Sequence, residues 1–226
     1  MLSKTDSRNR LSKAIFNFYR NINFKLTSSQ KNILDNLNEH KLILCEHQLF
    51  FPHLGIYRLP LMASSHYCNN ENGIVIFIVN DIFYRRNHFT TRKLGIYCDG
   101  QSQDFQKNPI IMKCSKSLPL HLAPSPSRGE LDSFSQKIKT KYQINFKRYN
   151  NMNNAKLTLS NQSFFHDRID FIFSLMKKSL ESTNNYSEWC IHFNMELFKL
   201  TNPIESSRII FLSHSQLIKE YEDILE

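Results

Sequence analysis

Six consecutive apolar residues, Ile74 to Val79, constrain the fold of this 226-residue chain more than any other segment. A continuous run of β-branched and aromatic side chains predicts a strand buried on both faces, because a half-exposed strand would alternate apolar and polar residues. Shorter apolar stretches at 94–98 and 109–112 predict neighbouring strands. The connection at 82–92 is short for a parallel crossover, which favours a mostly antiparallel sheet.

Two helices are predicted before this sheet. Apolar residues recur at helical spacing over 11–19 and again over 33–37, and the hydroxyl residues Thr27, Ser28 and Ser29 are N-cap candidates for the second helix. Short extended segments follow at 42–45, 49–51 and 55–59, an order also found in winged-helix DNA-binding modules and in many α+β proteins. The first half therefore predicts two helices followed by a mostly antiparallel sheet.

The second half predicts a mixture of helices and strands. Trp189, Ile191, Phe193, Met195 and Leu197 alternate with polar residues, a pattern typical of a half-buried strand. The complete set of expected elements is helix 131–141, strands 142–148 and 155–160, helix 168–182, strands 189–197 and 208–212, and helix 216–225. The predicted fold class is α+β, with a second mixed α/β half.

A Pro-rich segment separates the two halves. Pro119, Pro124, Pro126 and Gly129 interrupt regular structure between 115 and 130. We therefore predict a basic helix and sheet region at 1–114, a loop or linker at 115–130, and an α/β region at 131–226.

The charge balance favours a polyanionic partner. Lys and Arg number 29 against 20 Asp and Glu, a formal net charge of +9, and such a surplus is typical of nucleic-acid-binding proteins. We expect no membrane partner, because no apolar run is long enough to span a bilayer. Five scattered cysteines without an export signal predict a reduced, cytoplasmic protein. The Lys-, Asn- and Ile-rich composition is what an AT-rich gene would produce, which favours a microbial, phage or other mobile-element origin, including a defence system.

Basic residues gather in two places, near the N-terminus and just after the apolar strand. In the second cluster, cations stand beside aromatic residues, which suits nucleic acid because phosphates meet the cations and bases stack on the rings. The predicted contact residues are Arg8, Arg10, Lys13, Arg20, Tyr84, Arg85, Arg86, Arg92 and Lys93.

A catalytic alternative rests on His166, Asp167 and Arg168, which follow the strand predicted at 155–160. Together they would supply a base or nucleophile, an orienting carboxylate and a phosphate clamp. The triplet resembles one found after a strand in some phospholipase-D-like nuclease domains, which implies phosphodiesterase activity, although the chain contains no H-x-K-x4-D motif. Alternatively, Asp167 is the N-cap of the helix at 168–182.

Other sites have weaker support. Cys45 and His47 with His66 and Cys68 lack usual zinc spacing, and Asp81 and Asp99 would lie far apart at opposite ends of an antiparallel strand pair. The sequence therefore predicts no metal site, and it leaves any cofactor unknown. A third possibility is a non-enzymatic protein or inhibitor that docks a protein partner through an exposed aromatic patch.

Overall fold

The computed structural model describes residues 3–48, 54–67, 73–82, 118–153 and 159–225. Three parallel strands form its sheet in the order β1-β2-β3. Their bounds are Lys41–Gln48 for β1, Gly73–Asn80 for β2 and Ile209–Ser213 for β3. The central strand β2 is buried, and Ile74 through Phe77 have no exposed surface. The strand predicted from the apolar run is confirmed.

The direction of the sheet differs from the prediction. Helix α3 (Leu54–Tyr67) connects β1 to β2 and occupies the segment 55–59 that was expected to be extended. A helical crossover lets consecutive strands run parallel, whereas a tight hairpin would make them antiparallel. The mostly antiparallel sheet and the extended segment at 55–59 were therefore wrong, and the mixed class of helices and sheet is confirmed. The strands expected at 49–51, 94–98 and 109–112 lie outside the described residues.

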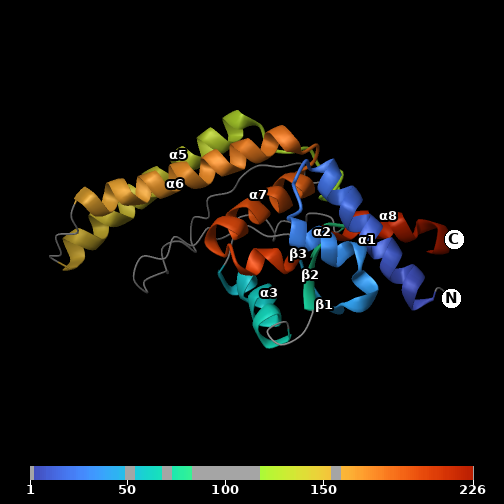
Figure 1. Ribbon diagram of the computed structural model, residues 1–226. Coiled ribbons are helices and arrows are strands. Elements are labelled where there is room, and N and C mark those ends of the chain that lie inside the picture. The colour runs from blue at the N-terminus through green and yellow to red at the C-terminus, as the bar shows by residue number, and fades with distance from the viewer. Residues whose placement is uncertain (1–2, 49–53, 68–72, 83–117, 154–158, 226) are drawn as a thin grey trace.

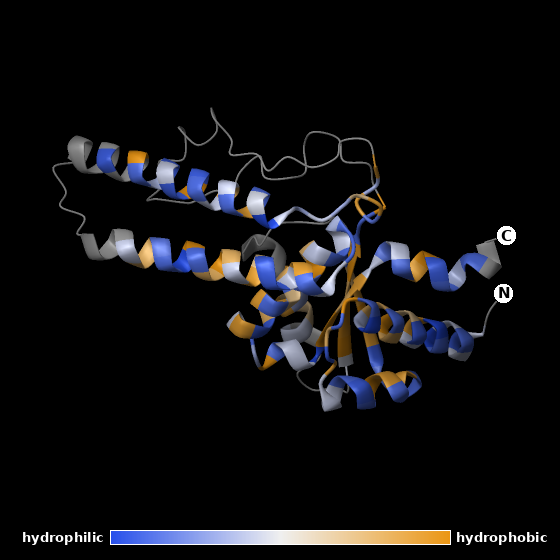
Figure 2. Ribbon diagram, turned by 90° about the horizontal axis from the view of Figure 1, so that it is seen from above, coloured by the Kyte–Doolittle hydropathy of each residue, from blue (hydrophilic) through white to orange (hydrophobic). Residues whose placement is uncertain are grey.

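Helices cover both faces of the sheet (Figures 1 and 2). Helices α1 (Lys4–Asn21), α2 (Ser28–Asp35) and α8 (His214–Leu225) lie on one side, and α3 and α7 (Tyr186–Thr201) lie on the other. The strands lie in the sheet in chain order, so the connections from β1 to β2 and from β2 to β3 advance in the same direction. Because such crossovers are right-handed, α3 and α7 lie on the same face. Three short 3₁₀ helices complete the described elements: η1 (Leu37–Glu39), η2 (Leu180–Ser182) and η3 (Glu205–Ser207).

Local capping signals explain where α2 and α8 begin. Thr27 Oγ1 accepts a hydrogen bond from the Gln30 backbone, and the Gln30 side chain accepts one from the Thr27 backbone, so the two form a capping box. Ser213 precedes α8, and its hydroxyl accepts from the Gln216 backbone at 3.3 Å. The N-cap expected at Thr27, the strand at 208–212 and the C-terminal helix are confirmed.

Two long antiparallel helices, α5 (Arg128–Asn153) and α6 (Leu159–Ser179), form a hairpin that extends beyond the sheet (Figure 1). Its helices pack through aromatic rings: Tyr142 stacks on Phe165 with centroids 3.5 Å apart. The strand predicted at 142–148 lies inside α5, and that prediction was wrong, because the apolar residues of this region pack helix against helix. Of the strand predicted at 155–160, residues 159 and 160 begin α6, and 155–158 lie outside the described residues.

The alternating segment at 189–197 is also a helix. Most of helix α7 is buried, and the polar residues Ser187, His192 and Asn194 are buried along with its apolar ones. Asn194 donates to the Cys190 carbonyl at 2.7 Å, and the His192 ring nitrogen lies 2.9 Å from the Ser179 hydroxyl. These internal partners allow polar residues to alternate with apolar residues inside a buried helix, so the predicted strand was wrong.

The N-terminal and C-terminal regions contribute to one sheet, since β2 pairs with β3. The described part of the Pro-rich segment packs against α7: Ala123 has no exposed surface, and its carbonyl accepts a hydrogen bond from the Tyr186 backbone at 2.8 Å. Independent folding of 1–114 and 131–226 stays a prediction. Among the described residues, no helix has the length and apolar character needed to cross a bilayer.

Candidate functional site

The predicted contact residue Arg8 lies on α1 and faces inward. Its Nη1 donates to the carbonyls of Leu37, Asn38 and His40 at 2.6, 3.0 and 3.0 Å. These carbonyl groups lie around the end of η1, and the Leu37 carbonyl also accepts from the His40 backbone at 3.4 Å. Arg8 therefore joins α1 to the segment that leads into β1.

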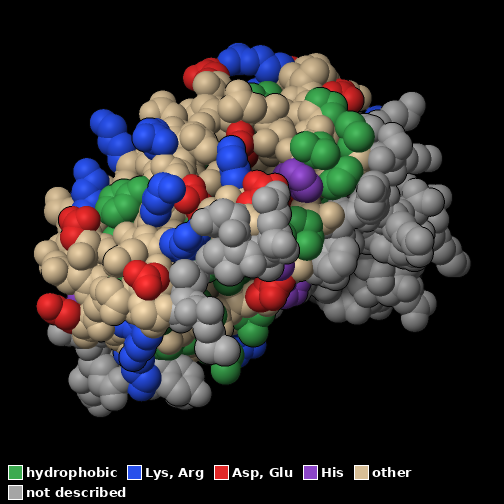
Figure 3. All heavy atoms as spheres, turned by 90° about the vertical axis from the view of Figure 1, so that its right-hand side faces the viewer, with side chains coloured by type: hydrophobic (Ala, Val, Ile, Leu, Met, Phe, Trp, Pro, Cys, Tyr) green, Lys and Arg blue, Asp and Glu red, His purple; other side chains and the backbone are tan. Residues whose placement is uncertain are grey.

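The other predicted cations of α1 also contact the protein itself. Arg10 donates to the Glu220 carbonyl at 3.0 Å, and Lys13 lies 3.0 Å from the Glu220 carboxylate. Arg20 donates to the side-chain oxygen of Asn17 at 2.9 Å. On the face shown in Figure 3, Lys and Arg are interleaved with Asp and Glu instead of forming one patch. Much of the α1 charge thus helps to hold α1 against α8.

The second predicted basic cluster, Tyr84, Arg85, Arg86, Arg92 and Lys93, lies outside the described residues. Those contacts stay a prediction.

The predicted catalytic residues His166, Asp167 and Arg168 lie within α6, well after its first residue, Leu159. Consecutive helical residues point about 100° apart, so the three side chains do not converge on one substrate atom. The expected strand end is absent here, and Asp167 is not an N-cap because the helix begins earlier. The guanidinium carbon of Arg168 lies 4.1 Å from the centre of the Phe164 ring.

The α5–α6 hairpin has two different flanks. One flank, the paired flank, carries ion pairs between α5 and α6, Lys139 with Asp170 at 2.5 Å and Asp132 with Lys177, and a pair between Arg128 of α5 and Glu181 of η2 at 2.6 Å. Lys139 follows the buried Ile138 of α5, and Asp170 follows the buried Ile169 of α6. We call the row of buried residues on each helix, which includes Ile138 on α5 and Ile169 on α6, its buried seam. The residues that directly follow the two seams therefore meet on the same flank.

Antiparallel geometry places the residues just before those seams on the opposite flank. We call this the basic flank. Its residues recur at i, i+4 and i+7 on each helix: Lys137, Lys141 and Ile144 on α5, and Phe164, Arg168 and Phe171 on α6. None of these positions holds an Asp or Glu. Ile144, Phe164 and Phe171 are 43%, 57% and 50% exposed. The basic flank thus presents three cations and three exposed apolar side chains, and the exposed Asp167 stands one helical turn from both Phe164 and Phe171.

A second polar site lies at the carboxyl ends of the parallel strands, where α/β proteins commonly bind ligands. Asp81, which follows β2, is 1% exposed. Its carboxylate accepts from three hydroxyl groups and one backbone N–H: Ser187 Oγ at 2.7 Å, Ser213 Oγ at 2.7 Å, Ser215 Oγ at 2.8 Å and Ser215 N at 2.9 Å. Asp81 therefore joins β2, β3, α7 and the beginning of α8.

Beside Asp81, Glu46 and His214 form a more accessible pair. His214 Nδ1 lies 3.5 Å from Glu46 Oε1, and the two side chains are 27% and 51% exposed. Asn80 Nδ2 donates to the same Glu46 oxygen at 2.7 Å. His214 Nδ1 is buried and makes no hydrogen bond to a described residue, so Glu46 lies close to the imidazole without orienting it. A histidine beside a carboxylate can still serve in acid–base chemistry.

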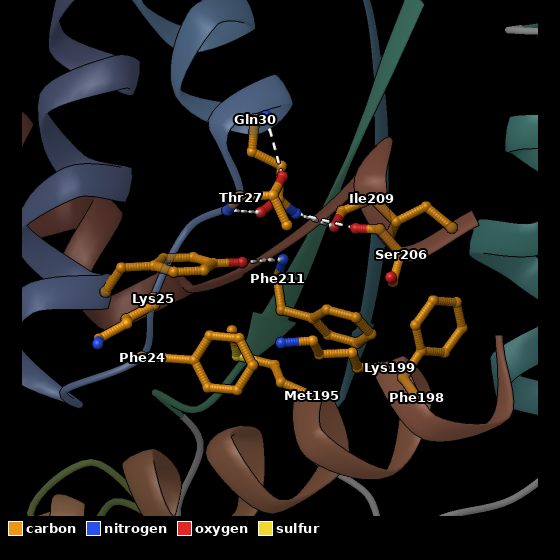
Figure 4. Close-up of a pocket in the computed structure, with 11 residues that line it drawn as sticks. Phe24, Lys25, Thr27, Gln30, Met195, Phe198, Lys199, Ser206, Ile209 and Phe211 are labelled. Carbon is orange, nitrogen blue, oxygen red and sulfur yellow. Dashed lines mark hydrogen bonds between the residues drawn. The ribbon is translucent and has the colours of Figure 1, made fainter. Parts of the chain in front are cut away.

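A small pocket lies beside β3, between α2 and α7. Phe24, Lys25 and Gln30 line it with residues of α7 and β3 (Figure 4). Its cavity volume is about 20 Å³, enough for about one water. Gln30 Nε2 donates to the carbonyls of Ser206 and Ile209 at 2.9 and 3.2 Å. The pocket is therefore a small packing gap, and the hydrogen bonds of Gln30 beside it connect α2 to β3.

The described residues contain no group of three or more His, Cys, Asp and Glu side chains placed to hold a metal ion. Asp99 and Cys68 lie outside the described residues. Of the two cysteines that are described, Cys190 has its pKa raised by burial to about 12, with a smaller opposing effect from the Asn194 hydrogen bond. A thiol of that pKa is a poor nucleophile near neutral pH.

Sequence reasoning missed both the basic flank and the Glu46–His214 pair. The flank had a readable signal, because Lys137 and Lys141 are four residues apart. It required α5 to be recognised as one long helix, whereas a strand was predicted from 142. The Glu46–His214 pair has no comparable signal, since 168 positions separate its members.

Comparison with known proteins finds no matching family model, no matching curated protein and no matching solved structure. The class defined here is therefore structural: a three-stranded parallel α/β sheet covered by helices on both faces, from which a helical hairpin extends.

Proposed function

We propose that this protein binds nucleic acid and that the basic flank of the α5–α6 hairpin contacts the phosphates. The observation that carries the proposal is the segregation of charge on the hairpin. Carboxylates pair with lysine and arginine on one flank, and Lys137, Lys141 and Arg168 stand together on the other, where Asp167 is the neighbouring acid. Cations arranged in this way attract the phosphates of a polyanion, and the net charge of +9 adds to that attraction.

Fluorescence anisotropy with a labelled oligonucleotide tests this proposal. Affinity should fall steeply between about 50 and about 200 mM KCl, because phosphate contacts release counterions. The double variant Lys137→Gln/Lys141→Gln should bind more weakly. For a single strand it should flatten the slope of log affinity against log salt by about 1.4, which is about 0.7 for each lost contact.

The matched control is Lys4→Gln/Lys31→Gln, which removes the same charge from exposed positions on α1 and α2. It should retain the slope of the unmodified protein. Equal losses for both variants would point to net charge alone, and a loss confined to the control would move the contact to the N-terminal cluster. Absence of binding at low salt contradicts nucleic-acid binding itself.

A second candidate function is phosphodiesterase chemistry, now with two competing histidines. The Glu46–His214 pair favours the carboxyl edge of the sheet as the place for acid–base chemistry, and His166 is the candidate from the sequence. Cleavage of a labelled oligonucleotide should be lost in His214→Ala and retained in His166→Ala if the carboxyl edge is the site. The reverse result supports the triplet at 166–168, and no cleavage by the unmodified protein contradicts both.

A further inference from the structure

We infer that the basic flank binds single-stranded nucleic acid, with bases stacked on Phe164 and Phe171. This inference rests on the proposed function and names the form of nucleic acid that the flank fits. Phe164 and Phe171 are two of the most exposed large side chains of the hairpin, at 57% and 50%. Each ring thus has surface that a ligand can reach without rearranging the buried contacts between α5 and α6, and Arg168 lies over one face of Phe164.

The two rings and Arg168 form a row along α6. A helix rises about 1.5 Å per residue, so Arg168 follows Phe164 by about 6 Å and Phe171 follows Arg168 by about 4.5 Å. The guanidinium carbon of Arg168 lies 4.1 Å from the Phe164 ring centre, which aligns a cation with an aromatic ring. Unpaired bases stack on both aromatic rings and guanidinium planes.

Lys137 and Lys141 stand across from this row on α5. Lys141 lies opposite Arg168, because Lys139 pairs with Asp170 in the antiparallel hairpin. Phosphates beside the lysines would place the attached bases over α6. This division of cations and rings is how proteins hold single strands without sequence preference. In a duplex the base faces are covered by their neighbours in the stack, so the exposed rings would have no base face to contact.

Two other occupants fit the flank less well. A symmetric pairing with a second copy would bring Lys137, Lys141 and Arg168 of both chains together, and like charges oppose such a contact. A helix lying on a membrane presents a continuous apolar stripe. Here Arg168 interrupts the stripe between Phe164 and Phe171.

The test uses the full chain and a labelled oligothymidylate of about 20 nucleotides, a single strand without internal pairing. Phe164→Leu/Phe171→Leu keeps two apolar side chains and removes both rings. We expect it to weaken binding at least about tenfold, since base stacking contributes about 1–3 kcal/mol per ring. The matched control, Leu122→Ala/Leu200→Ala, truncates two aliphatic side chains that are 60% and 55% exposed elsewhere, and it should bind like the unmodified protein.

A duplex of the same length should bind the unmodified protein more weakly than the single strand does. Photocrosslinking with a 5-iodouracil-substituted strand should place the crosslinks on Phe164 or Phe171. If the unmodified protein binds the single strand and the leucine variant binds it equally well, the stacking inference is wrong and the proposed function survives. Equal or tighter binding of the duplex also overturns the inference.

If the unmodified protein binds neither form of DNA at low salt, the proposed function fails with it. Sedimentation of the unmodified protein with phosphatidylserine-containing vesicles, or a dimer by light scattering that the leucine variant abolishes, would then assign the flank to a membrane or to a second copy. Either result overturns the inference.

Discussion

The backbone N–H of Ser215 donates to Oδ1 of Asp81 at 2.9 Å, across 134 positions of the sequence. This hydrogen bond places a buried carboxylate at the beginning of α8, where the positive end of the helix dipole stabilises negative charge. Three serine hydroxyl groups complete the set of donors. Asp81 is thus a positioning residue: it holds the start of α8, and with it His214, at the carboxyl edge of the sheet.

Replacing Asp81 should therefore destabilise the protein. Asp81→Ala leaves several buried donors without an acceptor, and we expect the free energy of unfolding in urea to fall by about 3 kcal/mol. The control is Asp167→Ala, which removes an exposed carboxylate from the middle of α6 and should change stability by less than about 0.5 kcal/mol. Similar stabilities for the two variants would contradict the role of Asp81.

Gln30 should contribute more to stability than its position on a short helix implies. Its side chain caps α2 and donates to two carbonyls around the start of β3. Gln30→Ala should lower the free energy of unfolding by about 2 kcal/mol, whereas Thr27→Ala, which removes only the cap, should lower it by about 1 kcal/mol. The control is Lys31→Ala, at the neighbouring exposed position, which should change the free energy of unfolding very little. A Gln30 variant no weaker than the Thr27 variant would refute the link to β3.

Arg8 offers a test that separates stability from binding. Its guanidinium donates to three carbonyls, so Arg8→Met should lower the free energy of unfolding by about 2 kcal/mol. Nucleic-acid affinity, measured by anisotropy where the variant is folded, should change no more than for Lys4→Gln. A stable Arg8→Met variant with strongly reduced affinity would show instead that Arg8 contacts the ligand.

Stability should depend on pH through His192. Burial lowers the pKa of His192 below its ordinary value of 6.5; Glu196 opposes the shift and Lys178 adds to it. The unfolded chain then binds a proton more readily than the folded protein as the pH falls below 6.5. Stability should therefore decrease from pH 6.5 downward and level off below the folded-state pKa.

Urea midpoints measured across this range for the unmodified protein and for His192→Gln provide the comparison. The glutamine variant retains a hydrogen-bonding side chain toward Ser179 and does not titrate, so its midpoint should fall less steeply as the pH decreases. Parallel pH profiles for the two proteins would exclude His192 as a source of the dependence.

The parts of the fold that were predictable from the sequence have local causes. The run at 74–79 is apolar enough to require burial on both faces, and Thr27 with Gln30 forms a capping box within four residues. Likewise, the strand at 209–213 and the helix after it follow from a short apolar stretch and an N-cap serine. Each of these signals acts between residues that are close along the chain.

The errors occurred where distant contacts decided the outcome. The alternation at 189–197 resembles a strand, but Ser179 and the Cys190 carbonyl supply partners that let His192 and Asn194 be buried in a helix. The aromatic pattern around Tyr142 also resembles that of a strand, but Tyr142 lies in a helix and stacks on Phe165 of the neighbouring helix. In both places, tertiary packing outweighed the local pattern.

The sequence by itself determined the buried central strand, the caps of its flanking helices and the surplus of positive charge. Only the tertiary structure decided the parallel direction of the sheet, because that depends on a helical crossover between β1 and β2. It also decided which cations are available to a ligand. Arg8 and Lys13 are engaged by groups far away in sequence, whereas packing of α5 against α6 leaves Lys137 and Arg168 together on one flank. Side-chain partners across the fold, and not the number of charges, determine which cations of this protein pair internally and which stand together on one surface.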